Sequence, residues 1–252
     1  MVYCLDFGRG MAMKKAIIFL ICGLVALLAI RSDLTQTPVV SEQNVPVSEN
    51  KDPATNDDAA LSLSHSRAVI AVDAGHGGSD AGYVSDTTIP EKDINLDLAR
   101  AIGRKLSAAG YQVIYTREND DVPAYDSEET ANKERINAMK NAGAQYLISI
   151  RLTNNADPLT KGFAVFTQPG ETTTRLANEV GASIAGINLS TFAGVDSDHY
   201  ANFSILTDKE LPSMLLELGY ITNPDDYAKI TDSEYQERIG EAVASAFLNT
   251  ID

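Results

Sequence analysis

Residues 69–82 read VIAVDAGHGGSDAG, an apolar run that leads into a glycine-rich turn holding one histidine. The β-branched run at residues 69–72 predicts a buried strand. The glycines of the turn allow positive φ angles and let a ligand approach the backbone closely. Open α/β sheets form their sites at the carboxyl ends of strands, so His76 stands where a site is expected. The same pattern also fits a tight connection with an incidental histidine.

Charge and cysteine content limit the possible functions. The chain has 252 residues and a formal net charge of -15, which argues against binding nucleic acid or anionic lipid through charge. Both cysteines, Cys4 and Cys22, precede the expected domain, so that domain has neither a disulfide nor a thiolate zinc site. Any metal there must be held by His, Asp or Glu. Of the three histidines, only His76 and His199 lie inside the domain, since His65 lies in the segment before it.

The N-terminal quarter has the pattern of an export segment followed by a spacer. Lys14 and Lys15 precede an apolar run at residues 16–30, which has the length of a signal-peptide core. Since no clear cleavage site follows, we expect residues 1–31 to be a signal peptide or an N-terminal membrane anchor. Residues 32–66 are rich in Ser, Asn, Asp, Thr and Pro, which predicts a disordered acidic and polar linker. On either interpretation the rest of the chain lies outside the cytoplasm.

Strand and helix patterns alternate from residue 67 onward. After the first strand, we expect further strands at Tyr111–Thr116, Gln145–Arg151, Gly162–Thr167, Phe203–Leu206 and Ser213–Leu218. Expected helices run from about Glu91 to Gly110, Ser127 to Asn141, Thr173 to Ile187, Asp225 to Ile230 and Ser233 to Leu248. This alternation predicts one three-layer α/β domain over residues 67–252. Its sheet is expected to be mostly parallel, with helices on both faces.

Four polar side chains follow strands or open a helix: His76, Glu91, Arg151 and Glu217. The carboxyl ends of parallel strands meet at one edge of a sheet, so these side chains are expected to converge. Glu91 also suits the start of a helix without any ligand, and Arg151 also suits a strand that ends in solvent. Glu217 directly follows four largely apolar residues. Burial of its carboxylate therefore requires a cation, a metal or a proton beside it.

Five short blocks occur together and in a fixed order: residues 72–78 (VDAGHGG), 91–93 (EKD), 115–117 (YTR), 162–163 (GF) and 216–223 (LELGYITN). With these blocks, residues 69–248 resemble the zinc-dependent N-acetylmuramoyl-L-alanine amidases, which act on peptidoglycan. The blocks span nearly the whole expected domain. The resemblance therefore implies a cell-wall context with peptidoglycan as the partner.

The resemblance also implies roles for individual residues. His76 and Glu91 match the first two zinc ligands, and a histidine at the end of the third strand is the third. A fourth position is left for water, whose pKa the zinc lowers. Glu217 matches the glutamate that acts as general base and then protonates the leaving amine. The bond that the family cleaves joins the lactyl group of N-acetylmuramic acid to the L-alanine of the stem peptide.

This sequence departs from the family pattern at the third ligand, where Ser-Ile-His is replaced by Ser149-Ile150-Arg151. A guanidinium has no free lone pair and cannot replace an imidazole as a ligand. We expect the guanidinium to lie between Glu91 and Glu217, where the metal would lie. The domain would then be a peptidoglycan-binding or regulatory module with impaired or lost zinc catalysis.

The alternative is an active zinc amidase with a non-standard third ligand. His199 is the candidate for that ligand, because it is the other histidine of the domain. Zinc is the cofactor if the protein is active. On both interpretations the N-terminal segment is the expected contact with the membrane.

Overall fold

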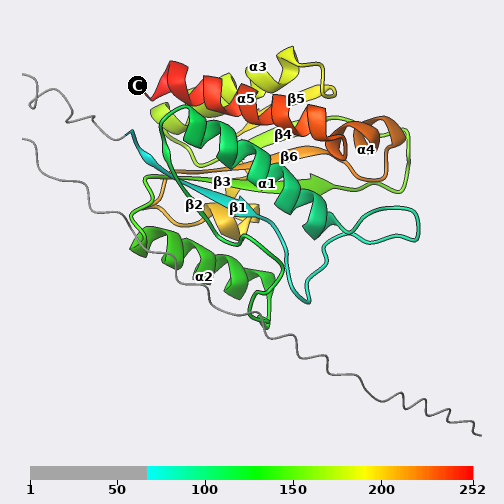
Figure 1. Cartoon of the computed structure of the whole chain (residues 1–252), viewed down its shortest axis with the longest axis horizontal. Coiled ribbons are helices and arrows are strands. Elements are labelled where there is room, and N and C mark those ends of the chain that lie inside the picture. Colours follow the sequence, from blue (N-terminus) through cyan, green and yellow to red (C-terminus); the bar gives the residue numbers. More distant parts are fainter. Residues whose placement is uncertain (1–66, 252) are drawn as a thin grey trace, which may run out of the picture. The chain divides into compact units, whose positions relative to one another are not determined.

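A six-stranded sheet forms the centre of the domain in the computed structural model, which describes residues 67–251 (Figure 1). The strand order is β2-β1-β3-β6-β4-β5. Strands β2, β1, β3 and β6 are parallel, whereas β4 pairs antiparallel with β6 and parallel with β5. The strands are β1 Val69–Ala74, β2 Gln112–Tyr115, β3 Tyr146–Thr153, β4 Phe163–Thr167, β5 Phe192–Asp196 and β6 Ser213–Tyr220. The predicted export segment and linker lie outside the described residues and stay predictions.

The described part of the chain has five α-helices, which lie close to the ranges that the sequence predicts: α1 Glu91–Ala108, α2 Glu128–Asn141, α3 Glu171–Gly186, α4 Pro224–Ile230 and α5 Ser233–Thr250. Two 3₁₀ turns, η1 Tyr200–Asn202 and η2 Ser204–Leu206, precede β6. The apolar residues spaced four apart along α1 are all buried, as a helix with one core-facing side requires. In residues 67–251, no helix is both long enough and apolar enough to span a membrane.

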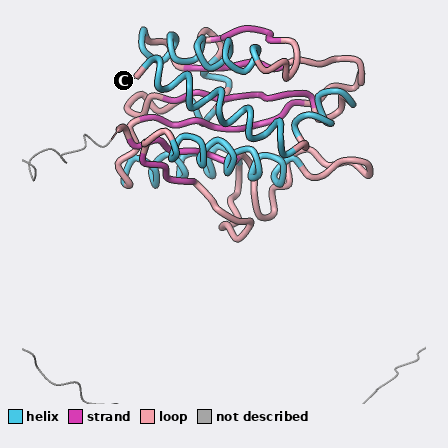
Figure 2. The backbone as a smooth tube through the Cα atoms, turned by 45° about the horizontal axis from the view of Figure 1, so that its top comes forward, coloured by secondary structure: helices cyan, strands magenta, loops and turns pink. Residues whose placement is uncertain are grey.

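The sheet has a helical layer on each face. Ile70 and Val72 pack into one apolar cluster with residues of α1, α3 and α5, whereas Ala71 packs into a second cluster with residues of α2 and η2. This division follows from the two-residue period of a strand. Figure 2 shows helices of the layer formed by α1, α3 and α5 lying across the strands. The predicted α/β domain with helices on both faces is confirmed.

The strand register places the polar residues of interest on the α2 face. Asp73 of β1 pairs with Ser149 of β3, and Arg151 pairs with Glu217 of β6. Each of these residues is an even number of positions from a residue of the α2-side cluster, such as Ala71. The carboxyl ends of β1, β3 and β6 therefore carry a carboxylate, a guanidinium and a second carboxylate on one face.

One predicted strand is wrong and one strand is missed. The predicted strand Phe203–Leu206 holds the 3₁₀ turn η2 instead, because Ile205 and Leu206 pack under α2 and do not pair with the sheet. A short apolar run does not distinguish these outcomes. The missed strand, β5, lies at the edge of the sheet, and the pattern FAGVD contains a glycine with a φ of 114°. Its side chains are half-buried or exposed, so its apolar signal is weak.

Candidate functional site

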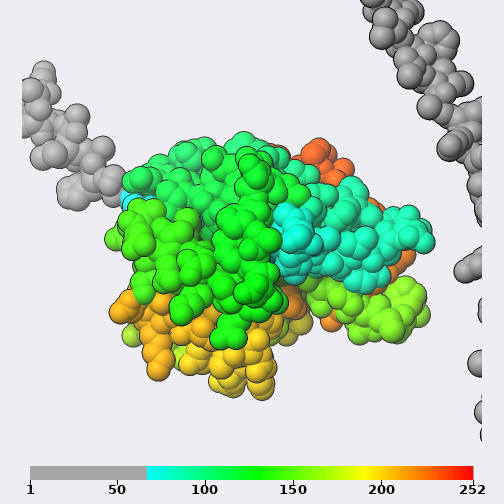
Figure 3. Space-filling view, turned by 90° about the horizontal axis from the view of Figure 1, so that it is seen from below, coloured from blue at the N-terminus to red at the C-terminus, as the bar shows by residue number. Residues whose placement is uncertain are grey.

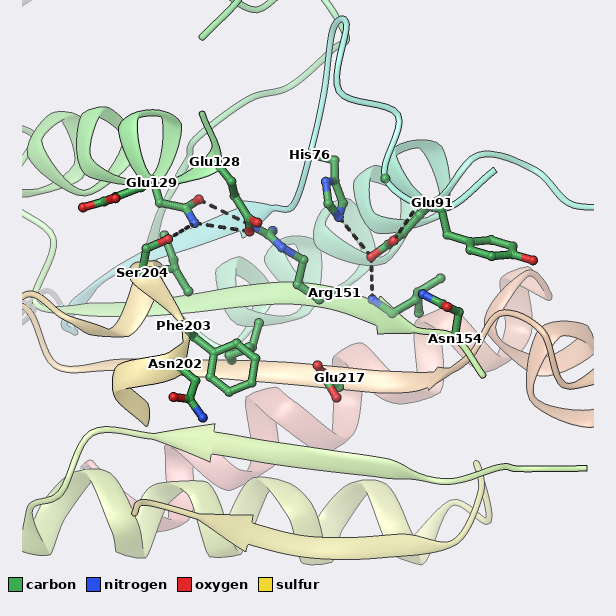
Figure 4. A pocket seen from close by; sticks show the side chains of 16 residues that line it. His76, Glu91, Glu128, Glu129, Arg151, Asn154, Asn202, Phe203, Ser204 and Glu217 are labelled. Carbon is green, nitrogen blue, oxygen red and sulfur yellow. Dashed lines mark hydrogen bonds and ion pairs between the residues drawn. The ribbon is translucent and has the colours of Figure 1, made fainter. Parts of the chain in front are cut away.

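A cavity of about 720 Å³ opens on the α2 face, and the four side chains singled out in the sequence all line it: His76, Glu91, Arg151 and Glu217. Figure 3 views the molecule from this side, with the β1–α1 loop beside α2 and the 3₁₀ turns below them. Figure 4 shows the side chains around the cavity. The predicted convergence of the four is confirmed, while their roles stay predictions.

His76 is held between two carboxylates. Its Nδ1 lies 2.8 Å from Asp80 Oδ2 and its Nε2 lies 3.3 Å from Glu91 Oε1. Burial and the charge of Arg151 act to lower the pKa of His76, but the bonds to Glu91 and Asp80 outweigh them and raise it. Its backbone φ is 62°, a conformation that costs a non-glycine residue roughly 1 kcal/mol or more. The guanidinium of Arg135 steadies this turn by donating to the His76 carbonyl oxygen at 2.7 Å.

Glu91 is buried at the first turn of α1, and its carboxylate is held by the backbone. The Leu152 N–H donates to Oε1 at 2.9 Å, and the Tyr83 N–H donates to Oε2 at 3.0 Å. Burial alone would raise the pKa of Glu91, but His76 and the two backbone donors together lower it. Glu91 is therefore an ionised carboxylate whose position is fixed by β3 and by the β1–α1 loop.

Arg151 does not lie between Glu91 and Glu217, so this prediction is wrong. Its Nη1 lies 3.4 Å from Asp73 Oδ2, and its Nη2 donates to Asn132 Oδ1 at 3.3 Å. Figure 4 shows the side chain pointing toward α2. The reason is electrostatic, because Asp73 is fully buried on the same face of the neighbouring strand. Burial would raise the pKa of Asp73, yet Arg135, Arg151 and two hydroxyl donors hold it below its usual value.

Gly75 provides the space that Arg151 occupies. A Cβ atom at position 75 would lie 1.7 Å from Arg151 Nη1 and 2.4 Å from its Cζ. Any side chain at this position would therefore displace the guanidinium. The glycine-rich turn serves the site through this close approach as well as through its positive φ angles.

Glu217 is the half-buried acid of the cavity that lacks a partner. Among residues 67–251, no hydrogen bond or ion pair engages its carboxyl group. Burial and the nearby charge of Glu91 raise the pKa of Glu217 to about 7. Among the described side chains no cation contacts this carboxyl group, and the raised pKa favours its protonated form.

His199 lies apart from the cavity. It is exposed, and its Nδ1 lies 2.8 Å from Asp196 Oδ2, which raises the pKa of His199. It is not among the residues that line the cavity. Within residues 67–251, no three His, Cys, Asp or Glu side chains are grouped so that they could hold a metal ion. The side chains of His76 and Glu91 supply two potential zinc ligands, and this set does not fit the three-ligand zinc site that the resemblance implies.

Asp73 and Asn132 are not among the site residues predicted from the sequence, although both contact Arg151. A signal for Asp73 exists, because this acid also follows a buried apolar run and therefore needs a cation. Asn132 gives no comparable signal, since its place beside Arg151 depends on how α2 packs on the sheet.

Comparison with known proteins places these residues in context. A sequence profile of the family described as N-acetylmuramoyl-L-alanine amidase matches residues 70–249. The N-acetylmuramoyl-L-alanine amidase LytC of Bacillus subtilis is 29% identical over 178 residues, which cover 69% of this chain and 34% of LytC. The probable cell wall amidase LytH of Staphylococcus epidermidis is 30% identical over 176 residues, which cover 69% of this chain and 55% of LytH. The chain thus spans about a third and about half of these two relatives.

A solved structure agrees with the sequence matches. The N-acetylmuramoyl-L-alanine amidase from Clostridium difficile 630 superposes with a TM-score of 0.65 at 28% identity. The match covers 74% of this chain and 98% of that one. The likeness therefore extends over the fold that carries the cavity.

Proposed function

The chain belongs to the N-acetylmuramoyl-L-alanine amidase family, and from this premise we propose that it is an extracytoplasmic cell-wall protein that binds peptidoglycan with zinc catalysis impaired or lost. In this proposal the domain acts as a binding or regulatory module. Peptidoglycan is the partner because the family acts on it and because one of the relatives described above, LytH, is described as a probable cell wall amidase.

The observation that carries the proposal is the place of Arg151. It stands at the strand end where the resemblance implies a third ligand, and it offers only donors. Its guanidinium lies against Gly75 and contacts Asp73 and Asn132, so it fills this part of the site and leaves no position there for another ligand. His76 and Glu91 provide only two zinc ligands, which is too few for a stable zinc site.

The loss of zinc would remove the main source of reactivity in such a site. Zinc, when bound, supplies a Lewis acid and lowers the pKa of bound water to about 7. The side chains of this cavity offer no equivalent. Glu217, with its pKa near 7, can hold or release a proton, and His76 is paired with two carboxylates. These groups bind and orient a ligand more readily than they hydrolyse an unactivated amide.

The cavity retains features of a glycopeptide-binding site. Its volume of about 720 Å³ falls in the range of small-molecule sites. Its lining offers amide, hydroxyl, carboxyl and guanidinium groups from Asn154, Asn202, Ser204, Glu217 and Arg151. Such a set suits the hydroxyl, amide and carboxylate groups of a sugar linked to a peptide.

We assign the export step and any membrane attachment to the N-terminal segment. Its basic residues and its apolar run at residues 16–30 have the pattern of a signal peptide or an anchor. The polar residues 32–66 would then separate the domain from the membrane surface.

The test combines binding with hydrolysis. The purified full-length chain is incubated with peptidoglycan sacculi, and co-sedimentation and release of free stem peptide are measured with and without added zinc. An active zinc amidase of the family serves as the positive control. Binding without zinc-dependent release supports the proposal. Zinc-dependent release would instead support an active amidase with a non-standard ligand, and absence of binding would overturn the peptidoglycan assignment.

A further inference from the structure

Three buried or nearly buried arginines surround the turn that follows β1, with one fully buried carboxylate among them. Arg117 and Arg151 are 5% and 7% exposed, and the side chain of Arg135 is 10% exposed. Asp73 is the carboxylate. Burial, together with the charges of Arg135 and Arg151, lowers the pKa of Arg117, which shows that the three cations repel one another. This part of the molecule carries more buried positive charge than Asp73 alone balances.

Two of the arginines are occupied with the backbone. Arg117 donates to the carbonyl oxygens of Ala74, Gly75 and Lys92 at 2.7–3.0 Å. Arg135 donates to the carbonyl oxygen of His76. These bonds are short, and neither side chain lines the main cavity. Both arginines therefore serve to hold the turn.

Arg151 differs because it lines the cavity and its own bonds are long. Its hydrogen bonds to Asp73, Ile150 and Asn132 measure 3.3–3.4 Å. Both oxygens of Asp73 already accept shorter bonds, at 2.7 Å from Thr116 and at 2.6 Å from Ser149. Arg151 is buried, and its long hydrogen bonds leave its guanidinium with capacity for a better acceptor.

A carboxylate, that of Glu128, already lies beside both Arg151 and Asn132. The Oε1 atom of Glu128 lies 3.7 Å from Arg151 Nη2 and accepts from Asn132 Nδ2 at 3.5 Å. Both separations are long, and the side chain of Glu128 is 59% exposed. A surface carboxylate in this loose arrangement marks the position of an anion without filling it well.

We propose that Arg151 and Asn132 form a subsite for a carboxylate of the peptidoglycan stem peptide, and that Glu128 covers this subsite when no ligand is bound. The proposal rests on the proposed function, because it assigns part of the ligand to the same cavity. It also gives Arg151 a role of its own. The guanidinium recognises an acidic peptide where the family would hold a metal.

The acidic half of the cavity does not prevent this binding. The charge of Glu91 is met by His76 and by two backbone donors. Glu217 has a pKa of about 7 and is therefore partly neutral at physiological pH. Among the carboxylates that line the cavity, Glu128 is the one within ion-pair distance of Arg151, and its exposed side chain can give way to a ligand.

The experiment compares two ligands that differ in one group. N-acetylmuramoyl-L-alanyl-D-glutamic acid with its γ-carboxyl group converted to an amide carries a single carboxylate, on the α carbon, and the corresponding α,γ-diamide has nearly the same size without that charge. Calorimetric titration of the full-length chain should give a Kd about tenfold lower for the acid, as one charge-assisted hydrogen-bonded contact predicts. Arg151→Gln should remove this preference by raising the Kd of the acid to that of the amide.

A second pair of variants avoids changes in the core. Glu128→Gln removes the covering charge and should tighten binding of the acid about threefold, with little effect on the amide. Glu129→Gln is the matched control, because Glu129 lines the same cavity and no contact joins it to Arg151 among the described residues. It should leave the preference for the acid unchanged.

The outcomes separate this inference from the proposed function. Equal affinity for the two ligands, or retention of the acid preference in Arg151→Gln, overturns the carboxylate subsite. Binding to sacculi without measurable binding of either ligand also overturns it and leaves the proposed function standing. Failure to bind sacculi overturns the proposed function itself.

Discussion

The two sides of the cavity are held by different kinds of contact. On the α1 side, His76 touches Glu91, whose carboxylate accepts backbone bonds of 2.9 and 3.0 Å. On the α2 side, Arg151 reaches Asp73 and Asn132 through contacts of 3.3–3.4 Å. The α1 side carries His76 and Glu91, which match two of the zinc ligands that the family resemblance implies. Under the proposed function, the α2 side carries the guanidinium of Arg151 where the resemblance implies a third zinc ligand.

The largest expected effect comes from making the α2 side match the α1 side. Arg151→His would place an imidazole at the strand end beside His76 and Glu91. We expect the variant to bind about one zinc per chain, measured by mass spectrometry of the full-length protein after exposure to zinc. Arg151→Gln is the control, since it removes the guanidinium without adding a ligand. If the histidine variant binds no zinc, other parts of the site have changed as well.

Removal of the buried carboxylate of Asp73 should destabilise the α2 side of the cavity. Asp73→Asn leaves Arg151 and Arg135 without their buried counter-charge, and we expect a loss of about 3 kcal/mol in the free energy of unfolding by urea. The control is Asp97→Asn, which disrupts an exposed ion pair with Arg100 at 3.7 Å. That change should cost under about 1 kcal/mol. Similar losses for the two variants would mean that the α2 side is not held by this charge.

A substitution at Gly75 tests the close approach of Arg151. In Gly75→Ala the new methyl group would collide with the guanidinium, and we expect a loss of about 1 to 3 kcal/mol. The loss should shrink when Arg151 is already alanine, giving a coupling energy of about 1 kcal/mol or more in a double-mutant cycle. Additive losses would contradict the placement of the guanidinium over Gly75.

The smallest expected effect concerns Glu217. Because burial and Glu91 raise the pKa of Glu217 to about 7, the folded state holds its proton more tightly than the unfolded state. Ionisation of Glu217 therefore lowers stability as the pH rises from the usual glutamate range, near 4.5, toward 7 and above. Glu217→Gln should be more stable than the original protein by about 1 kcal/mol at pH 8, with no such gain at pH 4. An equal gain at both pH values would refute this assignment.

Much of the fold follows from local sequence patterns. The apolar spacing of Ile94, Leu98, Ile102 and Leu106 is enough to define α1 and its buried side. The strand ends identify the residues that meet at one edge of the sheet, since parallel strands leave little freedom there. The predictions for edge strand β5 and for the turn at 203–206 are wrong because short, mixed sequence patterns take a structure that depends on what packs against them.

The site is predicted less completely than the fold. The sequence indicates which side chains meet, but the direction of Arg151 depends on the register that sets Asp73 opposite Ser149, and this is a tertiary property. Asn132 contributes through the packing of α2, which has no local signature. Long side chains reach several partners from one Cα position, so the convergence of residues is easier to predict than their pairing.

The metal content of the purified full-length chain after exposure to zinc tests directly whether this protein holds a zinc ion. We predict that zinc is not retained in a stoichiometric amount, because within residues 67–251 the cavity offers His76 and Glu91 as zinc ligands, while Arg151 contacts Asp73. Retention of about one zinc per chain, lost when His76 is replaced by alanine, would contradict the account and restore an active zinc amidase.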